Sequence, residues 1–96
     1  MQVKAAIEKK LTAALAPTRL SIVDESHLHA GHSGARPEGE THFRVEIASD
    51  RFDGVGRVQR QRLVYEILAE ELKGPVHALA LKTRTPAEDR AVAKED

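Results

Sequence analysis

The spacing of the apolar residues changes along this chain, and each spacing is typical of one kind of secondary structure. Over residues 3–15 they recur every fourth position, as in a helix that buries one face, and Pro17 bars its continuation. Over residues 41–47 they alternate with polar residues, as in a half-buried strand. One chain therefore combines a helical and an extended pattern, which predicts an α+β fold.

Three further segments complete the expected elements. Residues 20–24 form a short apolar run that predicts a strand before the alternating one. Residues 57–73 predict a second helix, which Gly74-Pro75 ends. Its expected buried stripe consists of Val58, Val64, Tyr65, Leu68 and Leu72, with Leu63 and Ile67 as a shoulder. Residues 76–82 are almost continuously apolar, as in a strand covered on both faces.

The order helix, strand, strand, helix, strand predicts how the strands pair. The first two, joined by one loop, should pair antiparallel, and the third, reached through a helix, should run parallel to the second. The expected fold over residues 1–86 is a small α+β domain, with helices packed on a three-stranded mixed sheet. Residues 87–96 are charged, have little to bury, and are expected to form a flexible, frayed tail.

Composition excludes several classes of protein. Ninety-six residues hold one modest core, with no room for separate cofactor and substrate domains. Fifteen basic and fifteen acidic residues cancel, which argues against strong non-specific binding to polyanions. The chain has no cysteine and no stretch near the roughly 20 apolar residues that span a bilayer. Its first residues also lack a secretory pattern. We expect a cytoplasmic protein that does not associate with membranes.

Four of the five histidines fall within residues 27–42, in a segment that also carries glycines and a proline. They are His27, His29, His32 and His42. Imidazole is the commonest metal ligand in proteins. The expected loop over residues 25–40 is longer than an ordinary connection, and such loops are usually functional or disordered. This segment is therefore the first place to look for function.

The predicted topology brings the fifth histidine to the same place. The end of the first strand and the starts of the second and third should lie at one edge of the sheet. His77, the second residue of the expected third strand, would then lie beside the histidine loop, although nearly 50 residues separate it from His29 and His32. His27 fits a turn better, and His42, next to buried Phe43, fits a structural role better.

Several motifs, in order along residues 3–86, resemble those of the BolA family. They are DESH (24–27), HAGH (29–32), GETHFRV (39–45), FDG (52–54), VQRQRLVY (58–65) and VHALAL (76–81). The resemblance implies a fold similar to class II KH domains. Two departures matter. The family often has Arg-His-Arg where this chain has Arg60-Gln61-Arg62. Gly54-Val55-Gly56 is not the Gly-x-x-Gly loop with which KH domains clamp nucleic acid.

The resemblance also implies a partner and a cofactor. BolA proteins pair with monothiol glutaredoxins and share a [2Fe–2S] cluster, for which the glutaredoxin and glutathione supply thiolates. His77 matches the family's histidine ligand. His32 is the expected second ligand from the loop, and His29 is the weaker candidate. No metal is expected in the isolated chain, which should be a monomer or a weak dimer. Zinc held by these histidines alone is less favoured, because a glycine-rich loop is a poor frame.

These considerations predict a non-enzymatic adaptor in iron–sulfur cluster trafficking or iron regulation, since no arrangement of catalytic residues is apparent. The alternative is a DNA-binding transcriptional regulator, because some bacterial members control transcription. Its contacts would come from the start of the second helix, through Arg57, Arg60 and Arg62. Leu63 and Ile67, on the shoulder of that helix, either pack on the first helix or belong to a partner surface.

Overall fold

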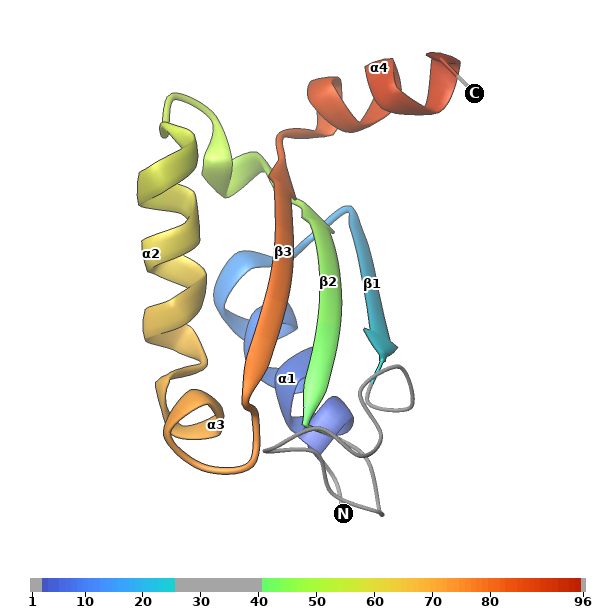
Figure 1. The fold of residues 1–96 in the computed structure, drawn as a ribbon. Helices are drawn as coiled ribbons and strands as arrows, with labels where there is room; N and C mark the ends of the chain where they lie inside the picture. The colour runs from blue at the N-terminus through green and yellow to red at the C-terminus, as the bar shows by residue number, and fades with distance from the viewer. Residues whose placement is uncertain (1–2, 26–40, 96) are drawn as a thin grey trace.

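A computed structural model describes residues 3–25 and 41–95 of the chain (Figure 1). Its elements in chain order are α1 (Val3–Leu15), β1 (Arg19–Asp24), β2 (His42–Ala48), the 3-10 helix η2 (Asp50–Phe52), α2 (Arg57–Ile67), α3 (Ala69–Lys73), β3 (Ala78–Arg84) and α4 (Pro86–Glu95). The predicted α+β class and the order of the first elements are confirmed.

The three strands form one mixed sheet in the order β1-β2-β3. β1 and β2 pair antiparallel, with Asp24 opposite Phe43, and β2 and β3 pair parallel, with His42 opposite Ala78. The pairing predicted from the sequence is therefore confirmed. This register brings the end of β1 and the starts of β2 and β3 to a single edge of the sheet (Figure 1).

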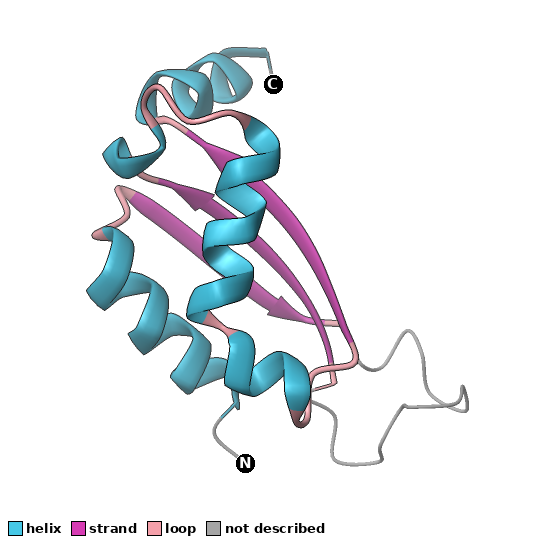
Figure 2. Cartoon of the chain, turned by 90° about the vertical axis from the view of Figure 1, so that its left-hand side faces the viewer, coloured by secondary structure: helices cyan, strands magenta, loops and turns pink. Residues whose placement is uncertain are grey.

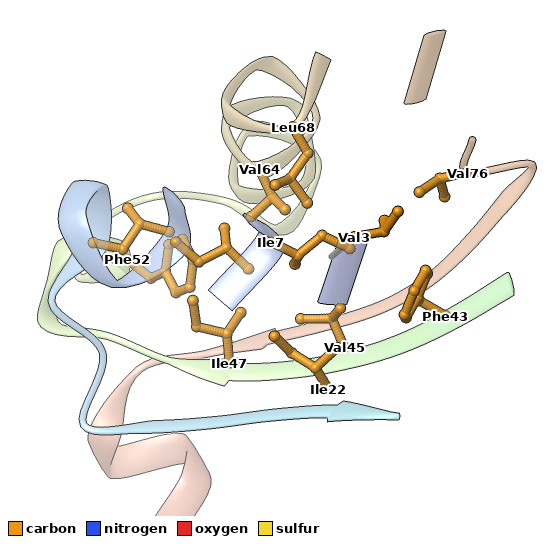
Figure 3. Close-up of a cluster of buried hydrophobic side chains, with 12 residues drawn as sticks. Val3, Ile7, Ile22, Phe43, Val45, Ile47, Phe52, Val64, Leu68 and Val76 are labelled. Carbon is orange, nitrogen blue, oxygen red and sulfur yellow. The ribbon is translucent and has the colours of Figure 1, made fainter. Parts of the chain in front are cut away.

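The helices α1 and α2 lie on one face of this sheet (Figure 2). The core lies between these helices and the sheet (Figure 3). Every fourth residue of α1 is buried, as its spacing predicts. The buried side chains of the core cluster, drawn in Figure 3, are Val3, Ile7, Leu11, Leu15, Ile22, Phe43, Val45, Ile47, Phe52, Val64, Leu68 and Val76. Aliphatic packing around two phenylalanines thus makes the single core that a chain of this length can hold.

The second helix differs from its prediction in two ways. It breaks at buried Leu68, whose backbone angles (φ −100°, ψ 19°) leave the helical region, so that α2 and α3 replace one helix over 57–73. Val58 and Tyr65 are exposed, although the sequence placed them on the buried stripe. The buried face of the helix differs from the predicted one because Arg60, one turn before Val64, is buried in place of Val58. A pattern based only on apolar residues assigned that position to Val58.

The third strand also differs from its prediction. β3 begins at Ala78 and ends at Arg84, so His77 precedes the strand instead of being its second residue. The outward residues Ala78, Ala80 and Lys82 are exposed, and the strand is not covered on both faces. Two small alanines on the open side made an alternating strand look continuously apolar.

The predicted frayed tail is wrong, because residues 86–95 form the helix α4. Its start is a reciprocal capping box: the Thr85 N–H donates to the Glu88 carboxylate (2.9 Å), and the Glu88 N–H donates to Thr85 Oγ1 (3.1 Å). Pro86 follows the cap at the first helical position, where its fixed φ suits a helix. Thr85-Pro86-Ala87-Glu88 is thus a start signal that the charged composition of the segment concealed.

Ion pairs join α4 to the rest of the domain. Asp89 accepts hydrogen bonds from Nε of Arg19 in β1, at 3.1 and 2.9 Å, and from its Nη2 at 2.7 Å. Glu88 pairs with Arg60 of α2 at 2.7 Å. Arg19 and Arg84 also both reach Glu46, at 3.3 and 3.1 Å, which ties this network to β2. Attachment of α4 therefore depends on carboxylates that remain ionised.

Acid should release α4 before it unfolds the sheet. The Arg60 guanidinium and the Thr85 N–H bind the charged form of Glu88 and lower its pKa from 4.5 to about 2. Arg19 likewise lowers the pKa of Asp89. A carboxylate with a depressed folded pKa stabilises the fold above its unfolded pKa, and this contribution is lost as the pH falls through the folded value. Cα chemical shifts of α4 should therefore move toward coil values between about pH 4.5 and 2, ahead of those of β2. Simultaneous loss of both elements would contradict this order.

Candidate histidine site

Backbone hydrogen bonds hold three segments together at the edge where β2 and β3 begin. The Thr41 carbonyl accepts from the His77 N–H at 2.7 Å and from the Ala78 N–H at 3.2 Å. The His42 carbonyl accepts from the Glu25 N–H at 2.7 Å. Residues that are far apart in sequence therefore meet at fixed positions, and the predicted placement of His77 at the ends of the 25–40 segment is confirmed.

Two imidazoles lie side by side at this edge. The His77 side chain is exposed, and His42 is half-buried. Their ring centroids are 6.3 Å apart, with 23° between the ring planes. The Thr41 hydroxyl lies 2.8 Å from His42 Nδ1. An exposed imidazole supported by a second ring is chemically suited to binding a transition metal.

The remaining predicted ligands lie elsewhere in the chain. His27, His29 and His32 fall outside the residues that the structure describes, so their predicted roles stay predictions. Within residues 3–25 and 41–95, no group of three or more histidine, aspartate or glutamate side chains is placed to hold a metal ion. The described part of the site is therefore a pair of histidines, which by itself provides fewer ligands than a closed zinc site needs.

Sequence reasoning assigned His42 a structural role and did not pair it with His77. The signal was available in the alternation of residues 41–47. Because Phe43 faces the core, His42 must point to the opposite face of the sheet. The parallel register then places it opposite Ala78, directly beside His77.

The three candidate arginines of α2 are not equivalent. Arg57 and Arg62 are exposed, but Arg60 is only 6% exposed. Its guanidinium donates to the Val55 and Thr83 carbonyls at 2.7 and 3.3 Å and lies 5.7 Å from the centre of the Phe52 ring. With Glu88 it also forms a two-pronged ion pair. Arg60 therefore joins α2, β3 and α4, and its predicted role as a nucleic-acid contact is wrong.

A basic groove lies where α2, β3 and α4 meet, at the end of the sheet away from His77. Its lining residues are Arg57, Gln61, Leu81, Lys82, Thr83, Arg84, Glu88 and Val92. Arg84 and Glu88 are engaged in the ion pairs already described, whereas Arg57 and Lys82 form no ion pair with any described residue. These two exposed cations give the groove its positive charge.

Leu63 and Ile67 are half-buried and pack against the hydrophobic core. Packing accounts for both residues, and their predicted place in a partner surface stays a prediction. Within the described ranges of the chain, no helix has the length and apolar character that crossing a membrane requires.

Comparison with known proteins identifies the fold just described. Residues 11–88 match the sequence profile of BolA-like proteins. This chain belongs to the BolA family. The structure of the BolA domain of SufE1 from Arabidopsis thaliana matches with a TM-score of 0.79 and 45% identity, covering 88% of this chain and 92% of that domain's chain. The solution structure of mouse BolA1 matches with the same TM-score and identity, covering 97% of this chain and 72% of the mouse chain.

Two curated BolA relatives carry different descriptions. Human BolA-like protein 1 is 51% identical over 94 residues, which are 98% of this chain and 66% of the human protein. The DNA-binding transcriptional regulator BolA of Escherichia coli (strain K12) is 47% identical over 85 residues, which are 88% of this chain and 77% of that protein. The chain spans only 60% to 66% of the length of the mammalian BolA-like protein 1 sequences.

Proposed function

We propose that this BolA-family chain is a non-enzymatic adaptor that binds a monothiol glutaredoxin and shares a [2Fe–2S] cluster with it. The observation that carries the proposal is the exposed His77 imidazole, which lies beside His42 at the edge where the histidine-rich segment leaves and rejoins the sheet. Such an adaptor would serve cluster trafficking or iron regulation.

The donor set of the chain fits a shared cluster better than one of its own. Iron–sulfur clusters are held mainly by cysteine thiolates, and this chain has no cysteine. Its own residues offer neutral imidazole, which in Rieske centres replaces two thiolates on one iron. A partner must therefore supply the thiolates, and a glutaredoxin with glutathione has that chemistry. The role of this chain is to present His77 without burying it.

Histidine ligation also makes the shared cluster sensitive to protons. A ligand imidazole must be neutral, and the reference pKa of histidine, about 6.5, lies close to physiological pH. Protonation takes the lone pair from imidazole, so a cluster ligated by histidine is held less firmly than an all-thiolate cluster as the pH falls toward this value. This difference suits a complex that transfers its cluster or senses the supply of iron.

Reconstitution tests the proposal. The purified chain is mixed with a monothiol glutaredoxin, iron, sulfide and glutathione, and the products are separated by size-exclusion chromatography. We expect a coloured heterodimer with a visible spectrum distinct from that of the glutaredoxin homodimer. An unchanged homodimer spectrum, with the two proteins eluting apart, would contradict the proposal.

DNA binding is the second candidate function, and two observations favour it. The E. coli relative is described as a DNA-binding transcriptional regulator. The groove between α2, β3 and α4 also presents the exposed Arg57 and Lys82, which form no salt bridge with a described residue, although Arg57 lies near enough to Glu88 to help lower its pKa. We propose these two cations as its phosphate contacts, in place of the buried Arg60.

Charge reversal in the groove tests this second function. The double variant Arg57→Glu/Lys82→Glu should weaken duplex binding and lower the slope of log K against log salt by about 2, because each lost phosphate contact removes about 0.9. Lys73→Glu makes the same type of charge change on α3, at the other end of the domain, and should leave the slope unchanged. A change of slope in Lys73→Glu about half that of the double variant, which reverses two charges, would show that binding follows net charge and not this groove.

A further inference from the structure

The strand β1 lies at one edge of the sheet (Figure 1). Among the described elements it pairs with β2 alone. The Glu25 N–H donates to the His42 carbonyl, so Glu25 and every second residue before it bond to β2. The backbone groups of Leu20 and Ile22 therefore point outward, where a further strand could bind them.

The middle of this edge lacks the features that usually keep edge strands apart. Natural proteins place lysine, proline, a bulge or an inward-pointing charge on such strands. Residues 20–23 are Leu-Ser-Ile-Val, and their register with β2 continues without a bulge. Ile22 points into the core, and Val23 is 44% exposed on the opposite face. The strand is therefore well suited to pairing with another strand.

A groove runs along the same strand on the side of the helices. It is lined by Lys4, Glu8 and Thr12 of α1 and by residues 17–22. The side chains of a strand added to β1 alternate between the two faces of the sheet, so half of them would lie in this groove. An added strand therefore has room beside β1.

The charges at the two ends of β1 favour an antiparallel partner of the same sequence. Arg19 begins the strand, Glu25 directly follows it, and both lie on the face opposite to Ile22. Antiparallel pairing of two copies brings the Arg19 of each near the Glu25 of the other, whereas parallel pairing brings like charges together. Both side chains already form ion pairs within the chain, so these charges set the direction of pairing more than its strength.

We propose that two copies of this chain pair antiparallel through β1, with Ser21 of one copy opposite Ser21 of the other. In this alignment Leu20 lies opposite Ile22 of the second copy, and each such pair exchanges two backbone hydrogen bonds. The apolar side chains of these pairs meet on the side of the helices. Two short strands bury less surface than a stable dimer needs, so the association is weak and depends on protein concentration. It does not depend on the shared cluster.

A single introduced cysteine tests the alignment, because the chain has none of its own. Opposite residues that exchange no hydrogen bond have Cα atoms about 4.5 Å apart in an antiparallel pair, which a disulfide can span. Ser21→Cys should therefore form a covalent dimer with oxidised glutathione at least about tenfold faster than Val23→Cys or Ala80→Cys does. Val23 lies two residues from the centre of the pairing, and Ala80 is exposed on β3, at the other edge of the sheet. Non-reducing electrophoresis measures the rates.

Self-association of the full chain provides an independent measurement. Ser21→Lys brings two ammonium groups together at the centre of the pairing and should raise the dissociation constant, measured by sedimentation equilibrium, by about tenfold or more. Val58→Lys adds the same charge at an exposed position of α2 and should leave that constant unchanged. Circular dichroism verifies that both variants fold.

Three results would contradict the proposal. Equal cross-linking rates for the three cysteine variants, or a monomer at every concentration, would overturn it and leave this edge to a strand from another protein. Faster cross-linking of Val23→Cys than of Ser21→Cys would overturn the alignment on Ser21. Equal dissociation constants for Ser21→Lys and Val58→Lys would show that the copies meet through another surface.

Discussion

Replacing His77 by alanine is expected to strip the cluster from the heterodimer while leaving the domain folded. The side chain is exposed and contributes no packing to the core, so the change in stability should stay within about 0.5 kcal/mol. Its backbone N–H, which binds Thr41, is retained in alanine. Loss of a ligand should cost more than loss of a residue that merely orients one, for which 10–100-fold is usual. Cluster absorbance after gel filtration measures the effect.

The matched control is His29→Ala, which removes an imidazole from the same chain outside the described edge. It should retain the cluster far better than His77→Ala does, with the same melting temperature. If His29→Ala loses the cluster and His77→Ala keeps it, the ligand has been assigned to the wrong histidine. If both variants keep the cluster as fully as the parent protein does, neither imidazole holds the iron.

Arg60→Glu should have the largest effect on stability among substitutions of charged residues. It removes the donor that satisfies the Val55 and Thr83 carbonyls and places a carboxylate at a site that is 6% exposed. Buried acceptors left without partners cost about 1–3 kcal/mol each, so we expect a loss of about 3 kcal/mol or more in the free energy of unfolding. A urea melt followed by circular dichroism measures it. The half-exposed Glu88 would also repel the new carboxylate.

Arg62→Glu is the control for this prediction, because the same charge reversal falls on the same helix at an exposed position. Its stability should change by no more than about 0.5 kcal/mol. If the two variants unfold with the same urea midpoint, the contacts of Arg60 do not hold α2, β3 and α4 together. The stabilities of the two variants also matter for DNA-binding experiments. A loss of binding in Arg60→Glu would follow from unfolding and would not show that Arg60 contacts DNA.

The topology and the place of His77 were predictable because both follow from periodicity. The fourfold spacing of Val3, Ile7 and Leu11 and the alternation of Phe43 and Val45 each specify an element and the face that it buries. The pairing of the strands then follows from the kind of connection between them. The place of His77 follows from the register of the strands, which brings residues 25, 41 and 77 to the same edge of the sheet.

The predictions for α2 and for the C-terminal segment were wrong because charged side chains there are buried or hold elements together, which apolar residues usually do. Arg60 occupies a core-facing position of α2, so a pattern of apolar residues assigned Val58 and Tyr65 to the buried stripe. The helix α4 is attached through Glu88 and Asp89, whose arginine partners are distant in sequence, and a charged segment of this kind looks like a tail. The stacking of His42 beside His77 was not foreseen, because it depends on a neighbour that only the register supplies.

The reduction potential of the shared cluster is the most direct test of the central claim that this chain contributes histidine ligands to iron. Replacing thiolate by neutral imidazole removes negative charge and raises the potential, as in Rieske centres. Potentiometric titration of the heterodimer, beside the glutaredoxin homodimer under the same conditions, should therefore give the higher potential for the heterodimer. Equal potentials for the two complexes would mean that the cluster keeps its thiolates and that His77 does not bind it.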